Sequence, residues 1–167
     1  FEKDKRVTLV LFSLPPNNKD EYTRKLYKEE YKFWESVNIE WQPLVPMEEY
    51  YDTLNNLRLD MMIIPRADNY FNRCKSNVKF LEASMFEIPC ICQSFPDGKS
   101  PYEVNKDDVD NLILATDIPD WIAKIEDLIV DKEKREALGK KAHQYVLDNY
   151  NIEDKGHLWK EAYQTLL

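Results

Sequence analysis

Short apolar segments alternate along this chain with longer segments whose apolar residues recur every three to four positions. The apolar, β-rich segments cover residues 6–14, 38–44, 59–64, 89–92 and 111–115. The segments with helical spacing cover residues 20–37, 46–57, 76–86, 117–129, 132–150 and 153–167. Asp20 and Asp117 are expected to cap the first and the fourth of these helices, Pro46 to open the second, and Pro119 to lie in the first turn of the fourth. Strands that alternate with helices in this way form a parallel sheet covered by helices. The order therefore predicts an α/β fold: a doubly wound, mainly parallel, Rossmann-like sheet with a helical C-terminal tail.

The length of 167 residues suits one domain with an ordinary hydrophobic core. We therefore interpret residues 1–167 as a single Rossmann-like domain. The chain begins with Phe1 and a charged segment, without an initiator methionine or a signal-peptide pattern. This beginning predicts a piece excised from a longer polypeptide.

Several nucleotide-binding and phosphoacceptor classes are excluded by the residues at the strand ends. With three glycines in the chain, there is no G-x-G-x-x-G turn and no P-loop. A phosphoacceptor receiver domain needs acids after its first and third strands, which here end in Ser13-Leu14-Pro15 and Ile64-Pro65-Arg66. Asp108-Val109-Asp110 matches the D-x-D of another class of sugar transferase, but it precedes an apolar strand instead of ending one. We interpret it as a solvated turn.

Charge narrows the choice of partner. The net charge of -8 argues against nucleic acid or an anionic membrane as the main partner. Residues 61–81 differ from this average, because they hold Arg66, Arg73, Lys75 and Lys79 against the single acid Asp68. A basic island in an acidic chain fits a small anionic ligand. No apolar run approaches the roughly 20 residues that span a bilayer, so no transmembrane segment is expected.

The three cysteines and two histidines predict no metal site. Cys90 and Cys92 are alternate residues of an expected buried strand, and His143 and His157 lie far away on expected helices. Zinc would need about four such ligands close together. The sparse cysteines, with Cys74 as the third, indicate reduced, buried thiols in a cytosolic protein.

The segment from residue 70 to residue 86 predicts a polar loop followed by a helix. Ser76 is a candidate N-cap for this helix, since its hydroxyl can accept a hydrogen bond from a first-turn N–H. Three apolar residues recur at helical spacing and are expected to face the sheet: Val78, Leu81 and Met85.

Two cations and one acid fall on another side of this expected helix. Lys75, Lys79 and Glu82 are separated by four and three positions. A phosphate could bind the lysines near the helix N-terminus, while Glu82 accepts hydrogen bonds from hydroxyl groups about one turn further on. An alternative is a solvated helix face with ordinary Lys/Glu pairs.

The residue order in this part of the chain resembles the C-terminal, donor-binding half of GT-B glycosyltransferases of the "group 1" superfamily. It looks closest to members that assemble bacterial surface polysaccharides. The resemblance rests on Asp60-Met61-Met62-Ile63-Ile64-Pro65, Phe71-Asn72-x-x-Lys75-Ser76-x-x-Lys79-Phe80-Leu81-Glu82-Ala83 and Ile88-Pro89. It continues weakly at Pro101-Tyr102, and more strongly at Trp121-Ile122-x-x-Ile125-x-x-Leu128-Ile129 and Leu138-Gly139-x-x-Ala142-x-x-x-Val146.

The resemblance implies a site for a nucleoside diphosphate sugar. In the family, two acids separated by seven residues flank the donor, and the second binds the ribose. Glu82 matches the second acid, whereas Cys74 stands at the position of the first. A basic residue after the first strand holds the diphosphate in the family, and the loop here offers Ser13, Asn17, Asn18 and Lys19. The expected donor-binding residues are Asn72, Arg73, Lys75, Ser76, Lys79 and Glu82.

The resemblance also implies an activity. The parent enzyme would be a glycosyltransferase that moves a glycosyl group from a nucleotide sugar to a saccharide or lipid-linked acceptor, without a cofactor or metal, in polysaccharide, O-antigen or capsule biosynthesis. The half that binds the acceptor, usually the N-terminal one, would be missing, so the chain alone would lack full activity. Trp159, Tyr163 and Leu166 would then face the missing half. The parent would lie in the cytoplasm, free or at the periphery of the inner membrane.

A second interpretation assigns the same fold to the chain but no catalytic function. The chain would be a non-catalytic α/β interaction module derived from the same fold, in which Lys75, Lys79 and Glu82 serve only as surface charge. Cys74 at an acid position and the scarcity of glycine agree with this alternative.

Overall fold

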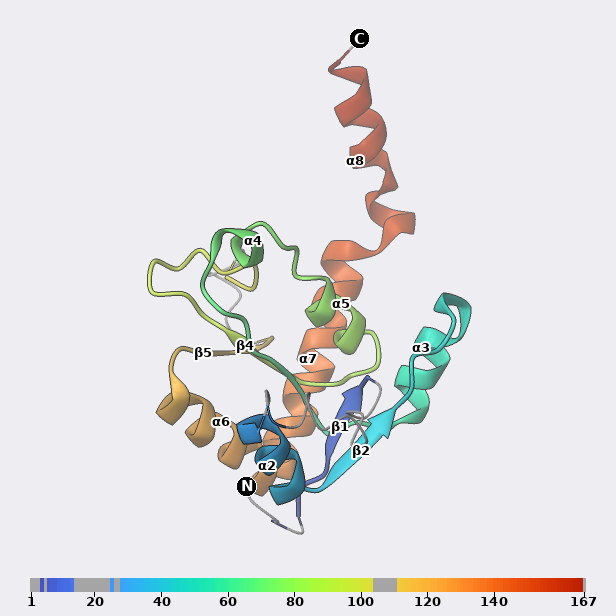
Figure 1. Ribbon diagram of the computed structural model, residues 1–167. Helices are drawn as coiled ribbons and strands as arrows, with labels where there is room; N and C mark the ends of the chain where they lie inside the picture. The colour runs from blue at the N-terminus through green and yellow to red at the C-terminus, as the bar shows by residue number, and fades with distance from the viewer. Residues whose placement is uncertain (1–3, 5, 14–24, 26–27, 104–110, 167) are drawn as a thin grey trace. The chain divides into compact units, whose positions relative to one another are not determined.

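A computed structural model describes residue 4 and residues 6–13, 25, 28–103 and 111–166 of the chain. The expected loop residues Asn17, Asn18 and Lys19, the expected cap Asp20 and the Asp108-Val109-Asp110 turn lie outside the described residues. The chain divides into two compact units, Phe1–Leu57 and Arg58–Leu167. Among the described residues, the strand pairs of both units are parallel, so the predicted α/β class is confirmed. Figure 1 shows the pair β1 and β2 with both arrows pointing the same way.

The described part of the first unit contains two parallel strands and two helices. Its described elements are β1 (Leu9–Phe12), α2 (Lys28–Ser36), β2 (Ile39–Gln42) and α3 (Met47–Asn56). β1 pairs with β2 so that Leu9 lies opposite Ile39. Pro46 stands immediately before α3, as the sequence predicts. Proline suits this place because the first N–H groups of a helix have no partner inside the helix.

The second unit contains a three-stranded parallel sheet followed by three long helices. The elements are β3 (Met62–Ile64), α4 (Tyr70–Arg73), α5 (Val78–Ser84), β4 (Cys90–Gln93), β5 (Ile113–Ala115), α6 (Ile118–Val130), α7 (Lys132–Tyr150) and α8 (Ile152–Gln164). β4 lies between β3 and β5. Strands in the middle of such sheets are apolar on both faces.

The core of the second unit lies where this sheet meets α6. Ile91, Ala115 and Leu128 are buried together, with Trp121 and Leu138 packed around them. Cys90 and Cys92 are fully buried as free thiols, which confirms the prediction of a buried strand. The prediction of a buried thiol is wrong for Cys74, which is exposed because it follows α4 on the surface of the unit. The register places Ile91 opposite both Ile63 and Ile113, so the middle strand is fixed on both sides.

Two expectations for α5 are wrong. The helix begins at Val78 with Asn77 as its N-cap residue, so Ser76 lies outside it and does not cap it. Val78 and Met85 are 43% and 45% exposed, and the buried stripe consists of Phe80, Ala83 and Ser84. α5 contacts both β4 and α7, and this second neighbour rotates the buried face away from the one that the apolar spacing predicts.

Caps fix the helices that follow β5. Asp117 caps α6 by accepting a hydrogen bond from the N–H of Asp120, as predicted, and Pro119 lies in the first turn. Asp131 caps α7 through the N–H of Lys134. Arg135 then donates to the carbonyl oxygen of Leu128 at 2.6 Å, which satisfies the end of α6. The predicted bounds of α7 are confirmed.

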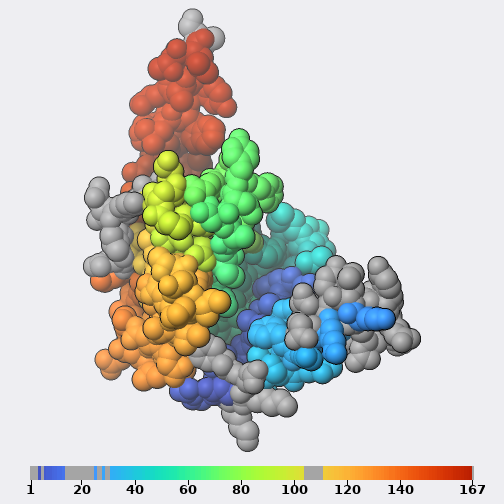
Figure 2. Space-filling view, turned by 60° about the vertical axis from the view of Figure 1, so that its left-hand side comes forward, coloured from blue at the N-terminus to red at the C-terminus, as the bar shows by residue number. Residues whose placement is uncertain are grey.

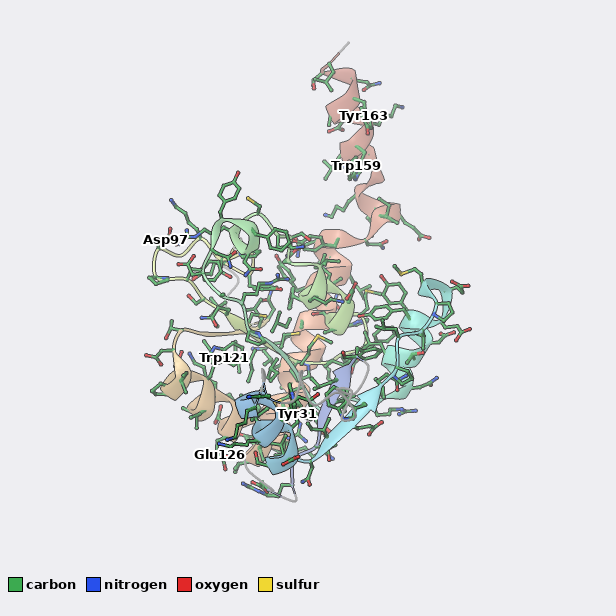
Figure 3. All side chains as sticks on the ribbon, viewed as in Figure 1. Tyr31, Asp97, Trp121, Glu126, Trp159 and Tyr163 are labelled. Carbon is green, nitrogen blue, oxygen red and sulfur yellow. The ribbon has the colours of Figure 1, made fainter. Side chains whose placement is uncertain are left out.

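The last helix, α8, buries none of its residues. Trp159 and Tyr163 are each 63% exposed on it, and Figure 3 shows both rings on α8. Among the described residues, no helix combines the length and the apolar character that crossing a bilayer requires.

Candidate functional site

The candidate site lies at the carboxyl ends of β3 and β4, where parallel α/β sheets bind their ligands. Residues 65–77 follow β3 and contain the one-turn helix α4, and residues 94–103 follow β4. Figure 2 shows α4 (green) and the loop after β4 (yellow-green) side by side on the surface. Five of the six predicted donor-binding residues lie beyond the end of β3 in α4, in the segment after it or in the first turn of α5, and the sixth, Glu82, lies further along α5.

Arg73 joins the two loops through two carboxylates. Its Nε donates to Asp68 at 2.6 Å, and its Nη1 donates to Asp97 in the loop after β4 at 2.6 Å. Figure 3 shows Asp97 in that loop beside α4. The guanidinium group also lies 5.3 Å from the ring centre of Phe95. Its hydrogen bond holds the pKa of Asp97 below the ordinary value, and the two acids raise the pKa of Arg73. The predicted donor contact of Arg73 therefore competes with two acids.

Arg66 makes a different set of contacts in the same region. Its Nε donates to the hydroxyl oxygen of Tyr102 at 3.0 Å, and its Nη1 lies 3.4 Å from the side-chain oxygen of Asn72. Asn72 in turn donates to the carbonyl oxygen of Ala67 at 2.8 Å, which orients its amide. Burial raises the pKa of Tyr102, and the hydrogen bond from Arg66 opposes this shift. Both partners of Arg66 are uncharged.

Glu103 organises the loop after β4. Its carboxylate accepts a hydrogen bond from the hydroxyl of Ser94 at 2.6 Å and from the backbone N–H of Ser100 at 2.8 Å. Ser100 is itself buried, and its hydroxyl donates to the carbonyl oxygen of Gln93. The loop that carries Tyr102 is therefore fixed by hydrogen bonds to the end of β4.

Gln93 ties the end of β4 to its neighbours. Its Nε2 donates to the carbonyl oxygen of Thr116 at 2.8 Å, and its Oε1 accepts from the indole N–H of Trp121 at 3.1 Å. Because Thr116 follows β5 and Trp121 belongs to α6, one side chain connects three elements at this edge of the sheet.

The predicted residues of α5 contact each other. The ammonium group of Lys79 lies 2.8 Å from a carboxylate oxygen of Glu82, whose side chain is 14% exposed. Lys75 lies over the ring of Phe71, 4.1 Å from its centre. Ser76 is exposed between the two helices. The structure thus brings Lys79 to Glu82, directs Arg73 to the acids of the loops, and places Lys75 on an exposed aromatic ring.

Three residues of this region were not assigned a role from the sequence: Arg66, Tyr102 and Glu103. Arg66 stands in the basic island, and Tyr102 stands in the weak continuation of the resemblance. Their contact joins positions 36 residues apart. The sequence signals were a cation directly after a strand and a tyrosine among turn residues, and neither shows that the two side chains meet.

Among the described residues, no three side chains of histidine, cysteine, aspartate or glutamate gather closely enough to hold a metal ion. The side chains gathered at the site include cations, an amide and a hydroxyl group. Such groups bind anions and the hydroxyl groups of sugars.

Comparisons with known proteins agree with this architecture. A search of curated proteins finds no match. Among solved structures, sucrose-phosphate synthase from Thermosynechococcus elongatus is similar, with a TM-score of 0.63 and 17% sequence identity. The match covers 96% of this chain and 38% of that protein, so the chain spans well under half of its length. This likeness establishes the fold of a GT-B half.

Sequence comparison with protein families gives the assignment. The model of a family described as glycosyl transferase-like matches residues 11–160, which include β2 to β5, the second half of β1 and the segment from α4 to α5. The chain therefore belongs to the glycosyl transferase-like family and has the Rossmann-like α/β fold of a GT-B half.

Proposed function

We propose that this chain binds the nucleoside diphosphate sugar of a glycosyltransferase. In the whole enzyme, a glycosyl group would move from this donor to a saccharide or lipid-linked acceptor in the assembly of a bacterial surface polysaccharide. A further domain would bind the acceptor, and the exposed rings of Trp159 and Tyr163 on α8 are the surface proposed to contact it. The whole protein would work in the cytoplasm, free or against the inner membrane.

The observation that carries this proposal is the position of the cations. Arg73, Lys75 and Lys79 lie on or beside α4 and α5, in the segment that follows β3. Cations at the carboxyl end of a parallel sheet suit a diphosphate. They would stabilise the negative charge that develops on the nucleoside diphosphate as it leaves the sugar, without a metal ion. Ser76 and Asn72 add neutral hydrogen-bonding groups.

Glu82 is proposed to accept hydrogen bonds from the ribose hydroxyl groups. Its side chain is mostly buried, and its carboxylate lies 2.8 Å from the ammonium group of Lys79, which holds it in place. In this arrangement Lys79 supports Glu82 as well as the diphosphate. Removing either side chain should weaken nucleotide binding.

The alternative is a non-catalytic interaction module, and one observation favours it. Arg73 is bonded to Asp68 and Asp97, and Lys79 is bonded to Glu82, so part of the basic island is neutralised within the chain itself. A module of this kind would not recognise nucleotides.

Thermal unfolding with ligands separates the two. A ligand that binds only the folded state raises the melting temperature according to its concentration relative to Kd, so even millimolar affinity is detectable. We would measure the melting temperature with UDP, GDP, CDP and ADP and with their sugar conjugates, and repeat the series for Lys79→Ala. A base-selective rise that Lys79→Ala lowers would support the donor site, and no rise with any nucleotide would support the interaction module.

Calorimetric titration tests the role of Glu82. Glu82→Ala should weaken binding of the nucleotide by about tenfold while the chain stays folded, because hydrogen bonds to a charged group are lost. An unchanged affinity would reject the ribose contact.

A further inference from the structure

Arg66 differs from the other arginine of the site in the charge of its partners. Arg73 is bonded to two carboxylates, whereas Arg66 is bonded to the hydroxyl of Tyr102 and lies near the amide oxygen of Asn72. Within the described part of the chain, no carboxylate pairs with Arg66. A half-buried guanidinium group with uncharged partners keeps its full positive charge for a ligand.

The nearby acids are engaged elsewhere. Asp68 and Asp97 accept from Arg73, and Glu103 accepts from Ser94 and Ser100. Each of these acids is held by its own loop contacts, so none is available to neutralise Arg66 without breaking them.

The donors of Arg66 are only partly used. A guanidinium group carries five N–H donors. Its Nε uses one toward Tyr102 and Nη1 uses one toward Asn72, while Nη2 donates to no atom of the described residues. Two neighbouring nitrogens with free N–H groups form the fork that binds two oxygens of one phosphate.

Tyr102 and Asn72 hold this fork in place. Tyr102 is only 5% exposed and lies beneath the guanidinium group, with its ring centre 5.6 Å from Cζ of Arg66. Its hydroxyl accepts from Arg66, and among the described residues nothing accepts the hydroxyl hydrogen in return. That O–H can therefore donate to the same anion.

We propose that Arg66 binds the diphosphate of the nucleotide through its two terminal nitrogens, with Tyr102 and Asn72 as the residues that position it. This assignment rests on the proposed donor-binding function and adds to it. It gives the diphosphate a partner, two residues after β3, that is not already paired with an acid of the chain.

Calorimetric titration of the 167-residue chain with UDP, GDP, CDP and ADP, with the nucleosides and with inorganic pyrophosphate tests the proposal. Arg66→Gln should weaken nucleoside diphosphate and pyrophosphate binding by about ten- to hundredfold and leave nucleoside binding unchanged. Arg66→Lys keeps the charge but loses the fork, so it should recover part of the affinity. Lys140→Gln on α7 removes one exposed charge and should change nothing.

Tyr102→Phe tests the positioning role without removing a charge. It should weaken diphosphate binding by about tenfold, with nucleoside affinity and melting temperature kept. A variant that merely loosened the loop would lower affinity for both ligand classes. If Arg66→Gln does not fold, Arg66→Lys and Tyr102→Phe carry the test.

Failure of this proposal is distinguishable from failure of the proposed function. Diphosphate affinity that stays unchanged in Arg66→Gln, or in both Arg66→Lys and Tyr102→Phe, would overturn the assignment and leave the donor site standing. Pyrophosphate binding that depends on Arg66, without binding of any nucleoside diphosphate, would support the anion site and reject the donor function. No binding of either ligand would overturn both.

Discussion

The turn that ends α5 leaves one position of α7 without room for a side chain. Glu87 has a φ of 57°, in the left-handed region, and its carbonyl oxygen faces Gly139 of α7. A Cβ atom built on Gly139 would collide with that oxygen and would lie 2.9 Å from the carbonyl carbon. The partner is backbone, which cannot move away as a side chain would.

Gly139→Ala should therefore destabilise the chain by roughly 1–3 kcal/mol, even though alanine favours helix. Gly156→Ala is the matched control, because a Cβ on Gly156 of α8 meets nothing within 4 Å. That substitution should stabilise by about 0.5–1 kcal/mol. Urea unfolding of both variants measures the difference, and equal effects of the same sign would contradict the collision.

Substitution of two buried serines, Ser84 and Ser100, should change the free energy of unfolding differently. The hydroxyl of Ser84 is buried and has no hydrogen-bond partner among the described residues, whereas the hydroxyl of Ser100 donates to the carbonyl of Gln93. Ser84→Ala should leave the free energy of unfolding unchanged or raise it, because an unsatisfied polar group is removed. Ser100→Ala should lower it by about 1 kcal/mol. Chemical denaturation decides, and a larger loss from Ser84→Ala than from Ser100→Ala would refute the argument.

At the scale of elements, the bridge of Arg73 connects α4 with the loop after β4. Arg73 of α4 makes charge-assisted hydrogen bonds to Asp68, just before α4, and to Asp97 in the loop after β4. The link therefore depends on the ionisation of the two carboxylates, and acid should release the loops before it unfolds the helices.

The pH dependence follows from the direction of the pKa shift. Asp97 has a folded pKa below its ordinary value of 3.8, because of the hydrogen bond from Arg73. Its contribution to stability is present above that value and disappears as the pH falls through the lower folded value. The melting temperatures of the wild-type chain and Asp97→Asn should differ at about pH 5 and converge toward about pH 2.

Asp52→Asn is the control for this titration, because Asp52 is exposed on α3. A constant difference between Asp97→Asn and the wild type across the titration would mean that the bridge does not stabilise the fold.

The sequence predicted most elements because each carries its own local signal. Asp117 with Pro119 marks the start of α6, and the charged amphipathic segment gives α7 its bounds. The helix α4 was missed because four residues hold barely one turn, too few for a repeating apolar pattern. The buried face of α5 was missed because it depends on α7, far along the chain.

Only those contacts of the candidate site that join residues close together in the sequence could be predicted. Lys79 and Glu82 meet because they are three positions apart on one helix, a spacing visible in the sequence. The contact between Arg66 and Tyr102 joins two loops, and the capture of Arg73 by Asp97 joins positions 24 residues apart. Such contacts between loops depend on which strands are neighbours and on their register, and neither can be read from one sequence.

At the scale of the whole molecule, apolar surface is divided unevenly between the helices. α8 exposes aromatic rings and buries nothing, whereas α6 packs Trp121 against the core. An exposed aromatic face on a terminal helix is typical of a surface that another domain covers. This agrees with the proposal that a further domain completes the enzyme.

Substitution of two of the four tryptophans, Trp159 on α8 and Trp121 on α6, measures this difference between the helices. Trp159→Ala should change the free energy of unfolding of the chain by less than about 0.5 kcal/mol, because an exposed ring loses few contacts. Trp121→Ala should cost about 3 kcal/mol, since it removes a core ring and its hydrogen bond to Gln93. Denaturation monitored by circular dichroism compares them, and a cost of Trp159→Ala above 1 kcal/mol, as an approximate threshold, would show that α8 packs within the chain.

The different burial of the three thiols allows the chain to be labelled with a dye at a single position. Cys90 and Cys92 are sealed inside the sheet, and burial raises the pKa of Cys92, which keeps it protonated and unreactive. Cys74 alone is exposed, immediately after α4 and between Arg73 and Lys75. A maleimide dye will therefore label one position, beside the proposed donor site, in the unaltered protein. Its fluorescence can follow ligand arrival in real time, without any engineered cysteine.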